Sequence, residues 1–410
     1  MYAVLTPAFS RREALSPSRI DWGQVPSPCF VMDEARLEVN MAFYKELQAT
    51  VPLEVLLALK GFAMFSVFDR MQGILKGTTA SSLHELQLGS RRFGGQQHIF
   101  MPAYPPAQVE EIAALAHHVS FNSVGQFLRH GPRMRQINPK IALGLRLNPG
   151  FSPVATELYN PCAAGSRLGI RLATLLQDDP ALEAAGMKPD FLHCHNLCES
   201  SAADLERTLD ILARDFRPWL ERVTSLNLGG GHLMTASSYD LSRMVGVVEA
   251  FHREFPHLKL WIEPGSALVW ETGYLRASVV EVVDTDTFPV AILDASITAH
   301  LPDVLEMPYR PAVWGAESLA PGETAVGRFP HCYRLGGQSC LAGDQVGIYR
   351  FERRLQEGDL ILFEDMMHYT MVKTNTFNGM ELPSIGIWHK DHSFETVKRF
   401  GYEDFESRLS

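Results

Sequence analysis

The sequence predicts an α/β protein, a (β/α)8 TIM-like barrel followed by a C-terminal, mostly antiparallel β domain. From about residue 40 to residue 275, short apolar runs alternate with stretches of helical spacing, which is typical of βαβ units and a parallel sheet. From Tyr274 onward, β-rich runs are separated by turns rich in Gly and Pro. We therefore expect the barrel to span residues 41–275, and residues 1–40 and 276–410 to form the β domain.

The expected barrel elements follow one another along the chain. The apolar runs that indicate buried strands are Val55–Leu59, Ile141–Leu147, Phe191–His195, Ser225–Leu228 and Leu258–Ile262. Stretches with helical spacing lie at Pro105–His117, Ser201–Phe216 and Tyr239–Phe255. The length of this region suits eight strand–helix units, because such barrels typically hold about 250 residues.

The expected strands of the β domain lie mostly after the barrel. They are Ala277–Val283, Val290–Leu293, Val346–Phe351 and Asp359–Phe363. The segment Pro28–Met32 is also strand-like. Because this segment precedes the barrel, we expect it to join the β domain.

Composition and charge exclude several classes of protein. Of the 410 residues, 46% are hydrophobic and 20% are charged. These values are ordinary for a globular enzyme, and they exclude a disordered chain, a collagen-like fibre and a disulfide-stapled miniprotein. The 37 basic and 47 acidic residues give a net charge of −10. A negative protein binds phosphate backbones poorly, so we expect no nucleic-acid partner.

The N-terminal segment and the cysteines predict a cytoplasmic protein. Met1–Phe9 is mildly apolar and is followed by Arg11 and Arg12, whereas a signal peptide places its positive charge before the apolar run. The six cysteines are scattered, without the density of small secreted domains. No stretch approaches the roughly 18 uninterrupted apolar residues of a membrane span, so we expect no membrane partner.

Lys60 is the first candidate for chemistry. It ends the apolar run that begins at Val55, and the carboxyl end of a barrel strand is where barrel enzymes place their active sites. Apolar surroundings disfavour the ammonium form, so they lower the pKa and make the amine a usable nucleophile toward a carbonyl group. The alternative is a lysine that caps the strand and extends to water.

The run His193-Cys194-His195-Asn196-Leu197-Cys198 is the second candidate. On a strand, His193 and His195 share one face and Cys194 lies on the other. The spacing differs from C-x-x-C and H-x-x-x-H metal sites, and we expect no metal here. A flat imidazole at a strand end could stack on a flat cofactor, and the alternative is a hydrogen-bonded core histidine.

Two further segments follow expected strands. Gly229, Gly230 and Gly231 remove Cβ atoms where backbone N–H groups could approach an anion, and late barrel loops often bind phosphate; a tight turn is the alternative. Glu263 begins the segment Glu263-Pro264-Gly265-Ser266. A partly desolvated acid needs a cation or a proton donor, for which a protonated pyridine nitrogen or backbone N–H groups would serve.

The β-rich half holds two more segments of interest. Cys340 and Asp344 lie among glycines in the run from Gly336 to Asp344, which resembles a site loop, although Cys340 could equally be an inert buried thiol. Tyr369-Thr370 follows, and then Thr376-Phe377-Asn378-Gly379.

The order of these segments resembles that of the pyridoxal-phosphate decarboxylases of the alanine-racemase fold (fold type III), from about Pro28 to Trp388. Within this group, the chain resembles the subgroup that acts on carboxynorspermidine and carboxyspermidine in polyamine biosynthesis. The segments that carry this similarity are Ser166-Arg167-Leu168-Gly169, Asp294 to Asp303, Ser339 to Asp344, and the tail from Arg399 to Ser410.

The resemblance implies a role for each candidate residue. Lys60 would hold pyridoxal 5'-phosphate through its amine, His195 would stack on the ring, Glu263 would keep the ring nitrogen protonated, and Cys340 would protonate the substrate α-carbon. The remaining assignments are phosphate binding by Gly229, Gly230 and Gly231, with Gly265 and Tyr369 also in the cofactor site, and binding of the substrate amines by Asp294, Asp303 and Asp344. The resemblance further implies a homodimer, in which β-domain residues reach the neighbouring active site, and a small cationic amino-acid or polyamine substrate.

Two departures from the family pattern bear on the substrate. Ser266 stands where ornithine and diaminopimelate decarboxylases usually have arginine, and Cys340 is followed by Leu341, with the acid only at Asp344. Decarboxylases of the same fold that act on diaminopimelate, ornithine or arginine remain alternatives. An amino-acid racemase would be expected to have a tyrosine base in place of Cys340, a non-enzymatic carrier is usually a lone barrel, and a cofactor-free aldolase using Lys60 would not need the glycine run.

Overall fold

The computed structural model describes residues 16–320 and 331–410, so the expectation for Met1–Phe9 lies outside the described residues. The described chain folds into two compact units. One comprises residues 40–268, and the other comprises residues 16–39 together with the described residues after 268.

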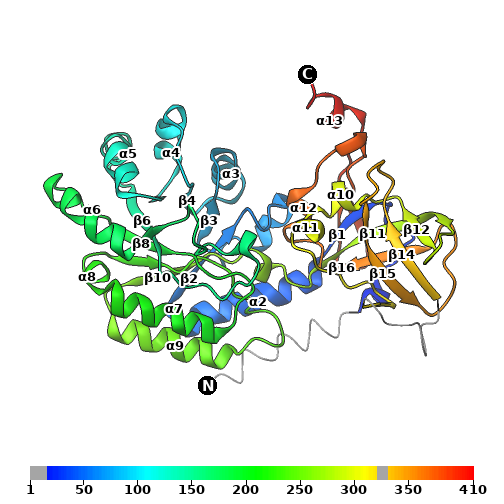
Figure 1. Cartoon of the computed structure of the whole chain (residues 1–410), viewed down its shortest axis with the longest axis horizontal. Coiled ribbons are helices and arrows are strands. Elements are labelled where there is room, and N and C mark those ends of the chain that lie inside the picture. Colours follow the sequence, from blue (N-terminus) through cyan, green and yellow to red (C-terminus); the bar gives the residue numbers. More distant parts are fainter. Residues whose placement is uncertain (1–15, 321–330) are drawn as a thin grey trace. The chain divides into compact units, whose positions relative to one another are not determined.

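The first unit is a closed parallel barrel (Figure 1). Among the described residues, its ring consists of eight strands, which are β2 (Leu53–Ala58), β3 (Gly77–Ala80), β4 (Gln96–Phe100), β5 (His118–Phe121), β6 (Ala142–Asn148), β8 (Phe191–Cys194), β9 (Ser225–Asn227) and β10 (Lys259–Ile262). The ring closes where Leu260 of β10 pairs with Leu53 of β2. A short strand, β7 (Ile170–Arg171), pairs with β6 outside the ring. The predicted barrel is therefore confirmed.

Helices connect successive strands and surround the barrel (Figure 1). They are α2 (Glu34–Thr50), α3 (Leu83–Leu88), α4 (Val109–Leu115), α5 (Val124–Ile137), α6 (Leu172–Ala184), α7 (Ala202–Asp215), α8 (Arg217–Leu220) and α9 (Leu241–Glu254). Shorter helical turns are η3 (Phe65–Arg70), η4 (Gly89–Phe93), η5 (Pro106–Gln108), η6 (Glu157–Tyr159) and η7 (Ser266–Leu268). The expected helix at Pro105–His117 is shorter in the structure, because η5 precedes it and Ala116 is extended.

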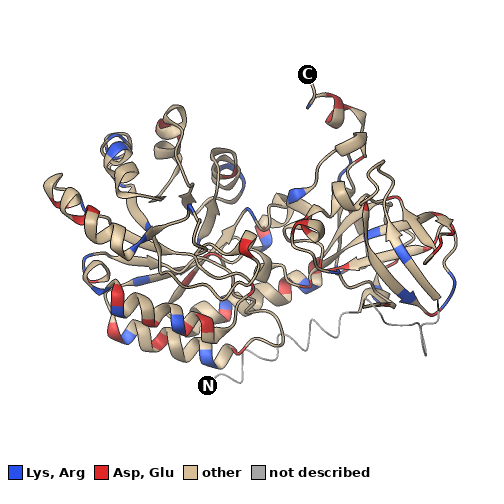
Figure 2. Ribbon diagram, viewed as in Figure 1, with Lys and Arg blue, Asp and Glu red and all other residues tan. Residues whose placement is uncertain are grey.

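Local sequence explains where α7 begins and which face it buries. Ser201 accepts a hydrogen bond from the N–H of Asp204, and the Asp204 side chain accepts one from the N–H of Ser201, forming a capping box. Leu205, Leu209 and Leu212 lie on one helical face and are buried. Acidic and basic residues are interspersed along α7 and α9 (Figure 2), and these two helices pack against each other.

The second unit is a mixed, mostly antiparallel sheet, as predicted. Its strand order is β13 (Ala316–Ser318), β15 (Gln345–Phe351), β14 (His331–Gly336), β12 (Val290–Leu293), β11 (Gly273–Val283), β1 (Cys29–Asp33), β17 (Ser384–Trp388) and β18 (Phe394–Lys398), and β16 (Leu360–Glu364) also pairs with β11. The expected strand near Pro28 is β1, which pairs antiparallel with β11 and parallel with β17. Helical elements of this unit are η2 (Pro17–Arg19), α10 (Ile297–His300), α11 (Pro302–Glu306), α12 (Thr370–Lys373), η8 (Phe377–Gly379) and α13 (Tyr402–Glu406).

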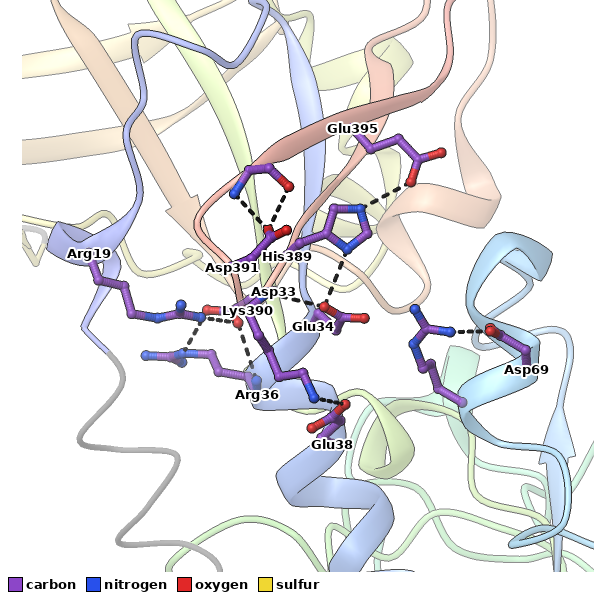
Figure 3. A network of polar contacts seen from close by, with 12 residues as sticks. Arg19, Asp33, Glu34, Arg36, Glu38, Asp69, His389, Lys390, Asp391 and Glu395 are labelled. Carbon is purple, nitrogen blue, oxygen red and sulfur yellow. Dashed lines mark hydrogen bonds and ion pairs between the residues drawn. The ribbon is translucent and has the colours of Figure 1, made fainter.

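A polar network joins the start of α2 to the β17–β18 hairpin (Figure 3). Buried Asp33, at the end of β1, pairs with Arg19. Burial raises the pKa of the Asp33 carboxyl, and the positive charge of Arg19 opposes that rise. Next along the chain, Glu34 Oε2 lies 3.3 Å from His389 Nδ1, and His389 Nε2 lies 3.0 Å from Glu395 Oε2. These contacts anchor the first turn of α2 within the second unit.

Within the described residues, every helix is too short or too polar to cross a bilayer.

Candidate active site

Lys60 lies in the turn that follows β2, at the carboxyl end of the barrel. The turn is held by the N–H of Gly61, which donates to Ala58 O at 3.0 Å, and the N–H of Leu59, which donates to Thr79 O at 3.1 Å. The pKa of the Lys60 amine is lowered, first by burial and then by the positive charge of Arg146. The predicted shift toward a neutral amine is consistent with this environment.

His195 contacts Lys60 from the end of β8. The distance from Lys60 Nζ to His195 Nε2 is 3.2 Å, and the N–H of Gly230 donates to His195 Nδ1 at 3.1 Å. Arg146 Nη2 donates to the backbone oxygen of His195 at 2.8 Å. Burial, reinforced by the charge on Lys60, lowers the pKa of His195 well below its ordinary value, so the imidazole is neutral.

The glycine run after β9 is required by close packing. Gly229 and Gly231 have φ values of 65° and 97°, which disfavour residues with a Cβ. A Cβ on Gly229 would lie 2.6 Å from His195 Nδ1, and a Cβ on Gly230 or Gly231 would overlap the backbone oxygen of a neighbouring segment. The N–H groups of Gly229 and Gly230 are already bonded, to Asn227 Oδ1 at 2.8 Å and to His195 Nδ1.

Glu263 follows β10 and faces the same end of the barrel. Its Oε1 accepts from Asn227 Nδ2 at 2.6 Å, and its Oε2 lies 3.8 Å from His193 Nε2. The side chain is only 11% exposed, and burial raises the pKa of the carboxyl, while hydrogen bonds from Asn227 and Thr79 oppose the rise. His193 Nε2 is buried and has no hydrogen-bond partner within the part of the chain that the structure describes.

Two residues of this region were missed from the sequence. Arg146 on β6 is 4% exposed and lies over the Phe100 ring at 4.3 Å; a single charge inside the apolar run Ile141–Leu147 is a signal that could have identified it. Gly61 approaches Gly265 so closely that a Cβ on Gly61 would lie 2.9 Å from Gly265 Cα. This close approach joins the turn after β2 to the turn after β10.

In the second unit, Cys340 lies beside the Phe377-Asn378-Gly379 turn. Its Sγ donates to Asn378 Oδ1 at 3.3 Å, and the cysteine is exposed. Asn378 has a φ of 58°, a left-handed conformation that asparagine tolerates better than most residues. Two segments singled out from the sequence therefore meet in the structure.

Asp344 connects three segments of the second unit. Its carboxylate accepts from Ser296 Oγ at 3.1 and 3.2 Å, from the N–H of Thr298 at 2.9 Å and from the N–H of Ser339 at 2.9 Å. These bonds secure the loop that carries Cys340 to the loop before α10. The carboxylate thus has an intramolecular role, and its role toward a substrate stays a prediction.

Asp303 and Asp294 differ in how their carboxylates are used. Asp303 is buried, and its Oδ2 accepts from Tyr309 Oη at 2.7 Å and from Thr370 Oγ1 at 2.9 Å. Its Oδ1 has no hydrogen-bond partner among residues 16–320 and 331–410. Asp294 Oδ1 accepts from the N–H of Ser278 at 2.8 Å.

Tyr369 immediately precedes α12 and has a φ of 48°. A left-handed conformation at a bulky residue is uncommon and often marks a functional turn. Its predicted place near the cofactor phosphate stays a prediction.

The structure therefore brings the predicted residues together in two separate sets. Lys60, His195, Glu263, the glycine run and Gly265 share the carboxyl end of the barrel, because parallel strands present these ends on one side. Cys340, Asp344, Asp303, Asp294 and Tyr369 belong to the second unit. Among the described residues, no group of three or more His, Cys, Asp and Glu side chains could hold a metal ion.

Comparisons with known proteins agree with this arrangement. Residues 29–367 match the family described as pyridoxal-dependent decarboxylase, C-terminal sheet domain. The chain is 48% identical to carboxyaminopropylagmatine decarboxylase of Synechocystis, over 94% of this chain and 96% of that protein. It is 36% identical to carboxynorspermidine/carboxyspermidine decarboxylase of Campylobacter jejuni, over 94% and 99%. The crystal structure of carboxynorspermidine decarboxylase from Campylobacter jejuni, complexed with norspermidine, is similar with a TM-score of 0.84 and 34% identity, covering 94% of this chain and all of that one.

Proposed function

The chain belongs to the pyridoxal-dependent decarboxylases, and from this premise we propose that it decarboxylates carboxynorspermidine and carboxyspermidine to norspermidine and spermidine. The enzyme is a decarboxylase that uses pyridoxal phosphate. The observation that carries the proposed substrate is the similarity, over 94% of this chain, to a carboxynorspermidine/carboxyspermidine decarboxylase.

The residues at the carboxyl end of the barrel fit the cofactor. Its aldehyde needs an amine, which Lys60 supplies in a site that disfavours the ammonium form. Its basic ring nitrogen needs a carboxylate, and Glu263 is buried at the same end without a cationic side chain bonded to it in the described network. The flat imidazole of His195, 3.2 Å from Lys60, suits stacking on the ring.

The bound cofactor supplies an electron-withdrawing ring that takes up the electrons left when CO2 departs. The protein keeps that ring effective, because Glu263 holds a proton at the ring nitrogen. Placing a cationic nitrogen beside the buried carboxylate also offsets the cost of its desolvation. Glu263 is positioned for this by the 2.6 Å hydrogen bond from Asn227.

Two of the three backbone N–H groups of the glycine run already have hydrogen-bond partners within the protein. The N–H groups of Gly229 and Gly230 are engaged by Asn227 and His195, so the phosphate could use them only by breaking those bonds. We assign phosphate contacts within the predicted set to Gly231 and Gly265, with Tyr369 from the second unit. The absence of Cβ atoms also allows His195, Glu263 O and Leu197 O to lie close to the glycine run.

Residues of the second unit would handle the substrate. We propose that the Cys340 thiol delivers a proton to the α-carbon after CO2 leaves, and that Asp303 binds a cationic amine of the chain. The support for Asp303 is its buried Oδ1, which lacks a hydrogen-bond partner in the described residues; a buried acceptor without a partner is costly. Asp294 and Asp344 remain candidates for the other amine groups.

We also propose a cytoplasmic homodimer in which the second unit of one subunit completes the active site of its partner. Mixing Lys60→Ala protein with Cys340→Ala protein tests this arrangement. If the sites are shared, subunit exchange should restore up to about a quarter of the wild-type activity, because about half of the dimers are mixed and each has one intact site. Recovery of no activity, with exchange demonstrated by a tag, would contradict the shared site.

A second candidate substrate is carboxyaminopropylagmatine, favoured by the 48% identity to the decarboxylase of that compound. The two candidates differ at the distal end, where a guanidinium presents a planar fork of donors and an ammonium acts as a compact charge. Release of CO2 should be compared for carboxynorspermidine, carboxyspermidine, carboxyaminopropylagmatine, diaminopimelate, ornithine and arginine. Highest kcat/KM for carboxynorspermidine or carboxyspermidine supports the proposal, and highest kcat/KM for any of the others overturns it.

A further inference from the structure

The contacts around His195 determine which of its ring nitrogens carries the proton. We propose that the N–H of Gly230 fixes the tautomer of His195, and that His195 in turn holds Lys60 as a neutral amine. Gly230 and His195 are then positioning residues for the lysine that receives the cofactor. The relevance of this inference to catalysis rests on the proposed function, but the hydrogen-bond argument does not.

The backbone N–H of Gly230 can only donate a hydrogen bond. It lies 3.1 Å from His195 Nδ1, so Nδ1 must be the unprotonated nitrogen that accepts. A neutral imidazole has one N–H, which must then be at Nε2. That N–H faces Lys60 Nζ at 3.2 Å. An ammonium at Lys60 would place two donors against each other, whereas a neutral amine offers a lone pair.

The glycine run makes this geometry possible. A Cβ on Gly229 would lie 2.5 Å from His195 Cβ and 2.6 Å from Nδ1, so a larger residue would push the ring away from the Gly230 N–H. A Cβ on Gly230 itself would overlap Glu263 O. These glycines therefore orient the imidazole, a role separate from binding an anion.

The charges around Lys60 act in both directions. Arg146 on β6 disfavours the ammonium form, as does burial, and the nearby acidic groups of Glu263, Cys198 and Glu85 favour it. Since burial is the largest influence, the balance lowers the pKa of Lys60. Burial is the main cause of the lowered pKa of His195, and the positive charge of Arg146 acts in the same direction, as Lys60, His193 and His232 do only when they are protonated.

Nitrogen NMR of the full-length protein, labelled with 15N-histidine and freed of cofactor, tests the tautomer directly. The His195 signals are assigned by their loss in His195→Leu. We expect an unprotonated Nδ1 and a protonated Nε2 at pH 8. A protonated Nδ1, alone or together with a protonated Nε2, would overturn the inference. This result does not depend on the substrate or on decarboxylation, so its failure is distinguishable from failure of the proposed function.

Acylation of Lys60 by acetic anhydride in the same cofactor-free protein, followed by mass spectrometry across a pH series, tests the second step. Exposed Lys140 in the same sample is the internal control. The Lys60 rate should reach its plateau at a lower pH than the Lys140 rate. His195→Gln keeps an N–H donor and His195→Leu removes it, so the acid dissociation constant of Lys60 should be roughly fivefold smaller in the Leu variant. An equal or larger constant in the Leu variant would contradict the role of His195.

Discussion

Replacing Gly231 with alanine probes the packing at the carboxyl end of the barrel. The residue has a φ of 97°, and a left-handed conformation costs an alanine about 1–2 kcal/mol. The new Cβ would overlap Leu197 O and lie 2.8 Å from Cys198 N. Both are backbone atoms of the loop that follows β8, so this loop must move, and overpacking of this kind typically costs about 1–3 kcal/mol. The combined loss in the free energy of unfolding is about 2–5 kcal/mol.

Gly186→Ala provides a matched control for Gly231→Ala. Gly186 has a φ of 63°, but an added Cβ there would have no heavy atom within 4 Å. The control therefore carries only the conformational cost, about 1–2 kcal/mol. In a thermal unfolding scan, a unit of this size should lose roughly 5–15 °C in Tm for Gly231→Ala and roughly 2–6 °C for the control. Equal shifts for the two variants would refute the packing argument.

Four further predictions concern catalysis and stability. Glu263→Gln should lower kcat by about 100- to 1,000-fold while visible absorbance still reports bound cofactor; wild-type turnover would contradict the role at the ring nitrogen. Cys340→Ser should slow formation of the decarboxylated product by about 100-fold or more, whereas Cys332→Ser should leave the rate unchanged. Equal effects of the two substitutions would show that Cys340 is not the proton donor. Asp344→Ala leaves several donors without an acceptor, each costing about 1–3 kcal/mol, so Tm should fall; a raised KM at unchanged Tm would instead make Asp344 a substrate ligand only. Burial lowers the pKa of His118 to about 4, so unfolding takes up a proton and the free energy of unfolding falls as the pH drops from about 6.5 toward 4. His118→Phe should reduce this pH dependence of the free energy of unfolding, as measured by urea titrations at several pH values. An unchanged pH dependence would show that His118 does not cause it.

The barrel site was predictable because periodicity and chain order determine where strand ends meet. Apolar runs ending at Lys60, His195 and Glu263 indicate buried parallel strands, and closure of the barrel then brings their carboxyl ends together. The glycine run was predicted for its lack of Cβ atoms. The specific neighbours that need this lack, such as the His195 ring beside Gly229, follow only from the folded backbone.

Contacts in the second unit could not be predicted in the same way. Cys340 and Asn378 are 38 residues apart in irregular segments, where no periodicity indicates which loops meet. The bonds from Ser296 to Asp344 cross 48 residues for the same reason. Arg146 was missed because its hydrogen bond to the backbone of His195 depends on the alignment of two strands that are neighbours in the ring but not in the sequence.

We propose that the amine of Lys60 carries the cofactor. Reduction of the purified protein with borohydride, followed by peptide mapping with mass spectrometry, would identify the modified residue. We expect a phosphopyridoxyl group on the peptide containing Lys60. The same group on a different lysine, with the Lys60 peptide unmodified, would show that Lys60 does not carry the cofactor.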